Sequence, residues 1–83
     1  MIKVLFFASL KETLGCDMLE IDDVDKIDSV AKLTEYLAQQ GPLWAKVMAE
    51  NNTLVAVNQT MASRQSTLSC GDEVAFFPPV TGG

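Results

Sequence analysis

The sequence predicts an α+β domain in which a mixed sheet is covered on one face by a main helix. Nearly continuous apolar runs occupy residues 1–8 and 73–77, as expected for strands at the centre of a sheet. Between them lies the clearest helical repeat, formed by Val30, Leu33 and Leu37. With strands first, then a helix, then strands, the compact arrangement places the first and last strands side by side and parallel.

The first half of the chain predicts two strands and two helical segments. After the strand at residues 1–8, residues 10–15 suit a short helix or turn, and residues 17–21 form a second short strand that pairs with the first. Asp28 or Ser29 is placed to cap the main helix. Pro42 ends the linker after that helix and opens a further helical stretch.

The second half predicts the remaining strands. Residues 54–57 form a third strand, and residues 59–62 carry a short fourth one. Gly71-Asp72 makes a turn into the last strand, residues 73–77. We therefore expect one domain over residues 1–78, followed by a flexible tail over residues 79–83.

The tail is where the sequence points to chemistry. Pro78 and Pro79 end ladder pairing because proline has no backbone N–H to donate. The residues that follow have small side chains and, at the end, unusual backbone freedom: Val80, Thr81, Gly82 and Gly83. We expect a thin, mobile tether whose terminal carboxylate can enter a narrow channel in a catalyst. The simpler interpretation is a frayed terminus.

Composition excludes several functions. The chain has 83 residues and no histidine, so it lacks room for a substrate-sized cavity and lacks the commonest general base and metal ligand. We expect no enzyme activity from this chain alone. The net charge of −5 disfavours nucleic acid and anionic membranes as partners, since both require clustered Lys and Arg. A partner with a basic surface is favoured.

The two cysteines indicate neither a metal site nor a redox motif. Cys16 and Cys70 lack C-x-x-C spacing, and two thiols do not complete a zinc or iron–sulfur site. We interpret both as free and reduced, and Cys70 as lying in a turn without a basic neighbour. The sequence shows neither a signal peptide nor an apolar run of about 18 residues, so we expect a cytoplasmic protein.

Alternation along the strands predicts an exposed apolar patch. If Val74 and Phe76 face the helix, then Phe77 faces the other side of the sheet, and Phe7 does the same at the end of the first strand. We expect Phe7, Phe77 and Met61 to form a partner-docking patch near the root of the tail. The alternative is a second core face beneath a loop.

Particular segments resemble a known family. The element order, the size and the terminal Gly-Gly are similar to those of ubiquitin-like β-grasp proteins. The segments MIKVLFFA (1–8), AVNQT (56–60) and GDEVAFFPPVTGG (71–83) resemble the small, sulfur-carrying subunits of molybdopterin synthase. The end-to-end similarity is most specific in the tail, whereas residues 16–50 fit any β-grasp domain.

The resemblance implies a mechanism and a set of partners. An activating enzyme uses ATP to adenylate the Gly83 carboxylate, with Gly82 beside it, and a persulfide donor or sulfurtransferase converts it to a thiocarboxylate. The residues from Pro78 to Thr81 then bind in the large synthase subunit, where the sulfur attacks cyclic pyranopterin monophosphate to build the dithiolene of molybdopterin. Two sulfurs need two carriers, which implies a heterotetramer with the catalytic side chains on the large subunit. No metal and no permanently bound cofactor is implied.

Two other functions remain open at this stage. One is a related carrier or modifier: a sulfur carrier of the thiazole pathway, or a ubiquitin-like modifier that Gly83 joins to lysines. The other is an interaction domain with an inert tail. Intact mass separates a sulfur carrier from a modifier. Exchange of oxygen for sulfur leaves the carrier as a free chain, whereas a modifier forms larger conjugates.

Overall fold

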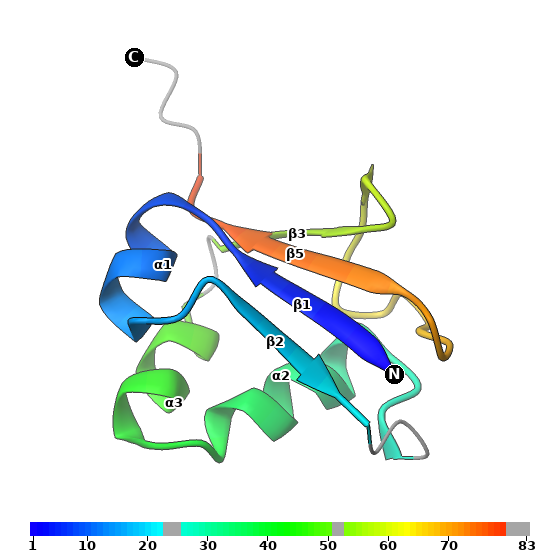
Figure 1. Ribbon diagram of the computed structural model, residues 1–83, viewed down its shortest axis with the longest axis horizontal. Helices are drawn as coiled ribbons and strands as arrows, with labels where there is room; N and C mark the ends of the chain where they lie inside the picture. The colour runs from blue at the N-terminus through cyan, green and yellow to red at the C-terminus, as the bar shows by residue number, and fades with distance from the viewer. Residues whose placement is uncertain (23–25, 51–52, 80–83) are drawn as a thin grey trace.

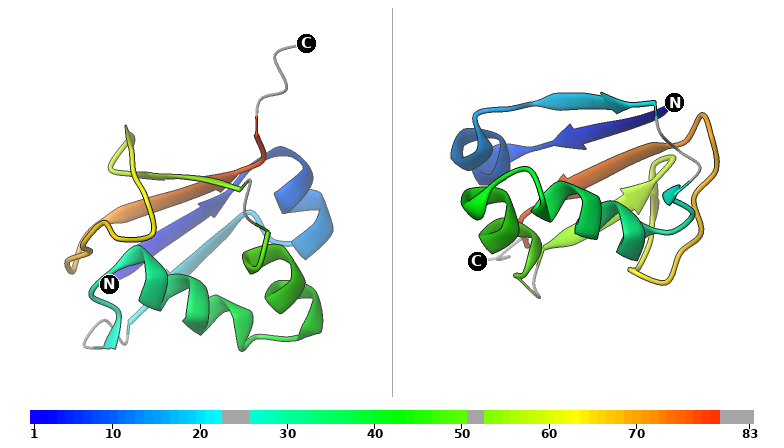
Figure 2. Two further views of the ribbon diagram at one scale, coloured as in Figure 1. Left: turned by 180° about the vertical axis from the view of Figure 1, so that it is seen from behind. Right: turned by 90° about the horizontal axis from the view of Figure 1, so that it is seen from below.

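The computed structural model describes residues 1–22, 26–50 and 53–79, and in these ranges the chain forms five strands and three helices. In chain order they are β1 (Ile2–Phe6), α1 (Ala8–Leu14), β2 (Met18–Ile21), α2 (Val30–Ala38), α3 (Pro42–Met48), β3 (Leu54–Val57), β4 (Thr60–Met61) and β5 (Glu73–Phe77). The strands form one sheet. Helices α2 and α3 lie against one face of it, and α1 lies beyond the end of β1 (Figure 1 and Figure 2).

The sheet has the predicted mixed topology. The described strands lie in the order β2-β1-β5-β3-β4, and β1 runs parallel to β5 at the centre while the other pairs are antiparallel. The prediction of adjacent, parallel first and last strands is therefore confirmed. So is the short fourth strand, which covers two residues.

The core forms where alternate residues of the two central strands meet the helices. The parallel register pairs Val4 with Val74 and Phe6 with Phe76, and all four side chains are buried. The rings of Phe6 and Phe76 stack with their centroids 6.0 Å apart. Trp44 of α3 meets Phe6 edge-to-face at 5.4 Å, an arrangement that aromatic pairs favour. Packing of α3 is thus tied to the central strand pair.

Local signals in the sequence explain where the helices begin and end. Ser29 caps α2, because its Oγ accepts a hydrogen bond from the backbone N–H of Lys32 at 3.2 Å. Pro42 occupies the first turn of α3, where its missing N–H costs nothing. Helix α1 starts at Ala8, two residues before the expected segment. It is capped at its C-terminal end by Gly15, whose φ of +65° suits a glycine. No helix within the described ranges is long and apolar enough to cross a membrane.

A polar network joins the β3–β4 turn to the loop before β5. Asn58 and Gln59 both have positive φ, as a two-residue hairpin turn requires. The Asn58 side chain donates to Asp72 Oδ1 at 3.0 Å, the backbone N–H of Ser69 donates to Asp72 Oδ2 at 2.8 Å, and Glu73 N–H donates to Asn58 Oδ1 at 3.0 Å. These bonds, first that from Asn58 and then that from Ser69, lower the pKa of Asp72 below its ordinary value of 3.8.

We predict that Asp72→Ala lowers the free energy of unfolding at neutral pH by about 1 kcal/mol, the usual contribution of such hydrogen bonds. Because the pKa of Asp72 is lower in the folded protein, its contribution is present above the unfolded pKa and is lost as pH falls through the folded value. Urea unfolding of wild type and variant across acidic pH should therefore show the difference shrinking.

Glu12→Ala is the matched control for this prediction. It removes the same charge from an exposed position on α1, where substitutions usually change stability by less than about 0.5 kcal/mol. If the Asp72→Ala difference stayed constant from neutral to strongly acidic pH, the carboxylate would not be its source.

Candidate functional site

The face of the sheet turned away from α2 and α3 carries one apolar side chain from each described strand in a single row. Met18 is paired with Leu5, and Leu5 with Ala75. Ala75 is paired with Ala56, and Ala56 with Met61. Directly paired residues point to the same side of a sheet. The five side chains therefore form a continuous band across the sheet.

A second, shorter row lies nearer the end of β5. Leu54 is paired with Phe77, and Phe7 follows β1 in an extended conformation, with its N–H bonded to the Phe76 carbonyl at 3.1 Å. By the alternation of β1, Phe7 points to the same side as Leu5. We call the residues of both rows the open face; they are Leu5, Phe7, Met18, Leu54, Ala56, Met61, Ala75 and Phe77.

The open face has exposed ends and a low centre. Phe7 is 48% exposed, Met18 42% and Met61 60%, while Ala56 and Ala75 at its middle are too small to project. Apolar side chains exposed together in this way are characteristic of interaction sites. The face is thus suited to receive a protruding apolar side chain of a partner.

A hollow of about 440 Å³ opens at the corner where β1, α1 and β2 meet. It is lined by Leu5, Phe6, Phe7, Ala8, Lys11, Asp17 and Met18. Its walls are mostly apolar, and Lys11 and Asp17 place one positive and one negative charge at its rim. The hollow extends the open face and gives it a polar edge.

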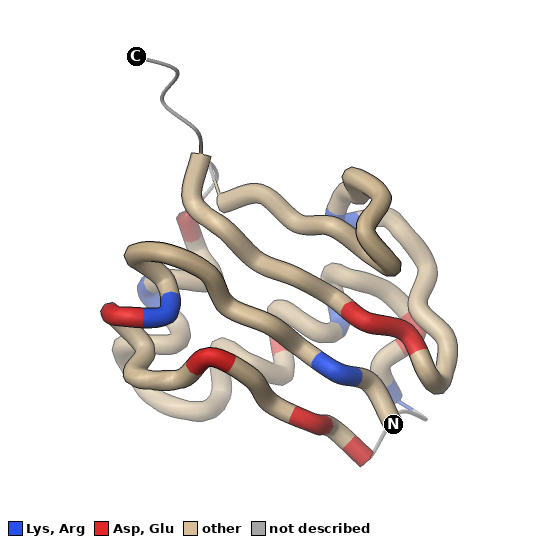
Figure 3. Tube along the Cα trace, turned by 45° about the horizontal axis from the view of Figure 1, so that its top comes forward, with Lys and Arg blue, Asp and Glu red and all other residues tan. Residues whose placement is uncertain are grey.

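Within the described strands, the charged residues on this side of the sheet lie at one end. The register places Lys3 between Glu20 on β2 and Glu73 on β5. Beyond this charged row, the remaining residues of β1 and β5 are uncharged (Figure 3). The polar row lies at the start of β1 and the apolar rows lie toward the end of β5, so the apolar part of the surface borders the root of the tail.

The predicted tail begins at this border. Strand β5 ends at Phe77, Pro78 is half-buried, and Pro79 is exposed. The predicted site residues Val80, Thr81, Gly82 and Gly83 lie outside the described residues. Of the predicted partner-binding residues, the structure places Phe7, Phe77 and Met61 on the open face, with Pro78 and Pro79 next to it.

Sequence reasoning missed three members of the open face, Met18, Leu54 and Ala56. Met18 and Leu54 were treated only as parts of strands, although each has a partner that faces outward, Leu5 for Met18 and Phe77 for Leu54. The antiparallel pairing of residues 17–21 with the first strand, once given a register, identifies Met18. Leu54 requires the register of β3 against β5, which the sequence does not specify.

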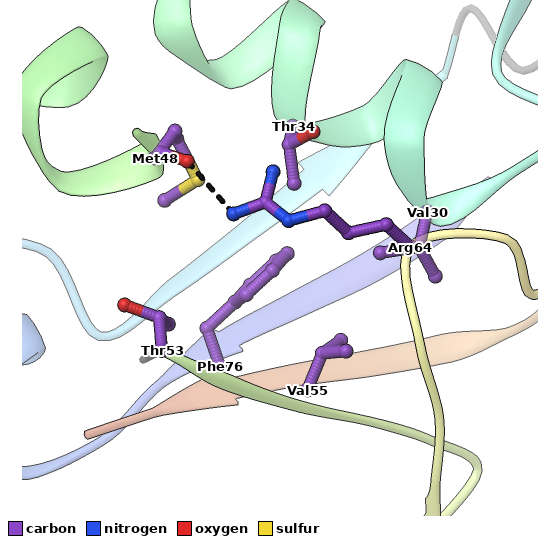
Figure 4. Close-up of a pocket in the computed structure, with 7 residues that line it drawn as sticks. All are labelled: Val30, Thr34, Met48, Thr53, Val55, Arg64 and Phe76. Atoms are coloured by element: carbon purple, nitrogen blue, oxygen red, sulfur yellow. Dashed lines mark hydrogen bonds between the residues drawn. The ribbon is translucent and has the colours of Figure 1, made fainter. Parts of the chain in front are cut away.

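A second cavity lies between the sheet and the helices. It holds about 20 Å³ and is lined by Val30, Thr34, Met48, Thr53, Val55, Arg64 and Phe76 (Figure 4). The Arg64 guanidinium extends across it and donates to the carbonyls of Met48 at 3.0 Å and Glu50 at 3.3 Å. The space suffices for about one water molecule, so Arg64 serves to hold the end of α3 and the cavity is no substrate site.

The structure corrects the prediction that Cys70 has no basic neighbour. The N-terminal ammonium of Met1 lies 2.8 Å from Cys70 Sγ, and Gly71 N–H donates to the Met1 carbonyl at 2.8 Å. The sequence could not show this, because the contact joins residues 69 positions apart. Within the described ranges, no group of three or more Cys, Asp or Glu side chains is placed to hold a metal ion.

Comparisons with known proteins agree with this architecture. The model of the ThiS family matches residues 4–83. The molybdopterin synthase sulfur carrier subunits of Escherichia coli strain K12 and Haemophilus influenzae are 47% and 43% identical to this chain over 83 residues, covering 100% of both chains in each case. The crystal structure of Haloferax volcanii small archaeal modifier protein 1 is 27% identical, with a TM-score of 0.78, covering 95% of this chain and 97% of that one.

Adjacent phenylalanines test the assignment of the two faces. We predict that Phe6→Ala lowers the free energy of unfolding by about 3–5 kcal/mol, because the ring is 1% exposed and leaves a cavity in the core. Phe7→Ala should cost about 1 kcal/mol or less, since half of that ring already contacts water. Denaturant titration measures both.

Phe6→Leu, which keeps more of the side-chain volume, provides the comparison if Phe6→Ala does not fold. Equal losses for the substitutions at Phe6 and Phe7 would show that the outer side of the sheet is also a packed core, and the open face would not exist.

Proposed function

We propose that this chain delivers sulfur through the carboxyl group of Gly83. The premise is that the chain belongs to the ThiS family and, within it, to the molybdopterin synthase sulfur carrier subunits. The observation that carries the proposal is the end-to-end similarity to the carrier subunit of Escherichia coli, 47% over the whole of both chains. Sulfur carriage in molybdenum cofactor biosynthesis follows from that membership. The chemical steps and the partners below are our proposal.

The chemistry starts from a poor electrophile. A carboxylate resists nucleophilic attack because its negative charge repels the nucleophile, so an activating enzyme first uses ATP to convert the Gly83 carboxylate to an acyl adenylate. The terminal sulfur of a persulfide donor then displaces AMP and forms an acyl disulfide. A thiol of the donor or of the activating enzyme attacks the donor sulfur of this S–S bond, so that the thiocarboxylate leaves and a disulfide remains on the partner protein. The sulfur of the thiocarboxylate is the nucleophile that attacks cyclic pyranopterin monophosphate. The chain supplies no histidine to act as a general base, so the two partners provide the catalytic groups.

The position of the open face determines how the tail is delivered. Phe77, at the end of β5, belongs to that face, and Pro79 is the last described residue beyond it. The four residues from Val80 to Gly83 span at most about 14 Å when fully extended. A partner that binds the open face must therefore hold its reactive groups within about that distance of Pro79.

We propose that the large subunit of molybdopterin synthase binds the open face and encloses this tail. Its contact surface should be apolar at the centre, to match the two rows, and basic at the edge that meets Glu20 and Glu73, in keeping with the net charge of −5. Each molybdopterin needs two sulfurs, so two carriers on a pair of large subunits give a heterotetramer. We place this reaction in the cytoplasm. Because the activating enzyme must reach the same Gly83, we propose that it uses the same face.

A specific observation favours a second candidate function, that of a protein modifier. The fold is similar to that of a small archaeal modifier protein, with a TM-score of 0.78. In a modifier, the activated Gly83 carboxyl is attacked by a lysine amine and an isopeptide bond forms. Intact mass distinguishes the two: the carrier returns as a free chain with one oxygen replaced by sulfur, whereas the modifier forms conjugates of higher mass.

We predict that one residue added after Gly83 abolishes sulfur transfer while changing stability by less than about 0.5 kcal/mol. The added residue moves the carboxylate by roughly 3.5 Å, and a misplacement of about 1 Å can already cost about 100-fold in rate. The assay combines variant, activating enzyme, ATP, a persulfide donor and large subunit, and measures dithiolene product together with carrier mass.

Deletion of Gly83 is the companion variant, and urea unfolding of both confirms that the domain is intact. If the extended carrier acquired sulfur and supported product formation without being trimmed back to Gly83, the terminal carboxylate would not be the reactive group. The proposal would then be wrong.

We predict that Phe77→Ala weakens binding of the purified large subunit about tenfold or more, the effect expected of an aromatic residue near the centre of an interface. Tyr36→Ala is the matched control: Tyr36 is a 38% exposed aromatic on α2, on the other side of the molecule, and its loss should leave the affinity unchanged. Calorimetric titration and thermal melting are measured on the same samples. A large loss of stability with unchanged affinity would place Phe77 in the core and remove it from the docking site.

A further inference from the structure

We propose that Met18 and Met61 form a paired oxidation site, at which conversion of both thioethers to sulfoxides releases the carrier from its partner. The proposal rests on the function proposed above, because it concerns the surface that binds the large subunit. It adds a modification chemistry that is separate from sulfur transfer at the tail.

The two methionines occupy opposite ends of the same row. Met18 stands on the edge strand β2 next to Leu5, and Met61 stands on the edge strand β4 next to Ala56. The sheet order places β1, β5 and β3 between them, and Ala75 lies at the middle of the row. A partner that covers the row therefore contacts a thioether at each end of its footprint.

Their exposure makes these thioethers reactive in the free carrier. Met18 is 42% exposed and Met61 60%, whereas Met48 is 4% exposed and lies in the core. Oxidation follows access of the oxidant to the sulfur. Met1 is also exposed, at 48%, but it precedes the charged row of Lys3 and so lies off the apolar rows. The chain thus contains an oxidisable methionine away from the open face and a protected one, both of which serve as internal references.

The reaction needs only a peroxide as oxidant. A lone pair on the methionine sulfur attacks one peroxide oxygen, the O–O bond breaks, and a sulfoxide and water are formed. The sulfur loses two electrons and the peroxide gains them. Methionine sulfoxide reductases reverse the change, so the modification can act repeatedly on one molecule.

The sulfoxide alters binding without altering the fold. In the free carrier its oxygen is solvated, because both side chains are exposed. In the complex the same oxygen would be buried against an apolar partner surface, where an acceptor without a hydrogen-bond donor is costly. We expect the doubly oxidised carrier to bind the large subunit about tenfold or more weakly, an effect on the scale of one buried unsatisfied acceptor.

The test compares peroxide-treated carrier with the Met18→Leu/Met61→Leu double variant, which retains apolar bulk but has no thioether on the open face. After hydrogen peroxide treatment, a reductant returns oxidised Cys16 and Cys70 to thiols. Peptide mass mapping then locates the sulfoxides. Mapping is essential, because one sulfoxide oxygen adds about 16 mass units, nearly the same as the exchange of oxygen for sulfur at Gly83. Affinity for purified large subunit is then measured by titration.

We expect wild type to lose affinity about tenfold or more on oxidation and to regain it with methionine sulfoxide reductases. The affinity of the double variant should be the same before and after peroxide treatment, because its open face carries no thioether. Oxidation of Met1, which both proteins retain, should therefore not affect binding. Melting temperatures should not change. Pre-formed complex should protect Met18 and Met61 but leave Met1 oxidisable.

The inference is overturned if carrier with sulfoxides at both Met18 and Met61 binds the large subunit with unchanged affinity. It is equally overturned if peroxide treatment lowers the affinity of the double variant as much as that of wild type. It is also overturned if Met18 and Met61 are oxidised no faster than the buried Met48. Failure of the proposed function has a different signature, because untreated wild type would then show no binding to the large subunit at all.

Discussion

The parallel pairing of β1 with β5 is the constraint on which the rest of the structure depends. Its register sets Phe6 against Phe76 in the core, and strand alternation then directs Phe7 and Phe77 to the opposite side. The same pairing brings the start of the chain beside the strand that leads into the tail. Core, open face and tail root are therefore consequences of one pairing, and a shift of one residue would exchange the two faces.

Much of the fold could be predicted because local and long-range signals agree. The apolar runs at both ends predict central strands, and the Ser29 cap with the repeat of Val30, Leu33 and Leu37 predicts α2. The early start of α1 at Ala8 was not predictable, since Ala8 has a φ of +54° that alanine seldom adopts. Likewise, the contact of the Met1 ammonium with Cys70 arises only when the loop before β5 folds back beside β1.

The site was predictable to the extent that it follows from alternation. Phe7 and Phe77 were identified because neighbours in the same strands had to face the helices. Met18 and Leu54 required registers against β1 and β5 that depend on loop lengths and core packing. Gly83 lies outside the described residues and stays a prediction, which rests on the small residues of the tail and on the resemblance of the terminal segment to one family. Alternation alone says nothing of acyl chemistry, and the family likeness alone says nothing of the shape of the open face.

In the proposed function, the open face has to satisfy two opposed demands. It must bury apolar area against its partners, yet a free carrier with a continuous apolar surface risks self-association. The net charge of −5 and the row of Glu20, Lys3 and Glu73 oppose that association.

Small residues at the centre of the open face limit its exposed apolar area, and the methionines Met18 and Met61 are exposed at its two ends. Methionine adapts to surfaces of different shape because it is unbranched and polarisable, which suits the proposed use of this face by both an activating enzyme and a synthase subunit. The thioether that allows this adaptation is also the group that peroxide attacks, so the proposed binding of two partners and the proposed sensitivity of that binding to oxidation have the same chemical origin.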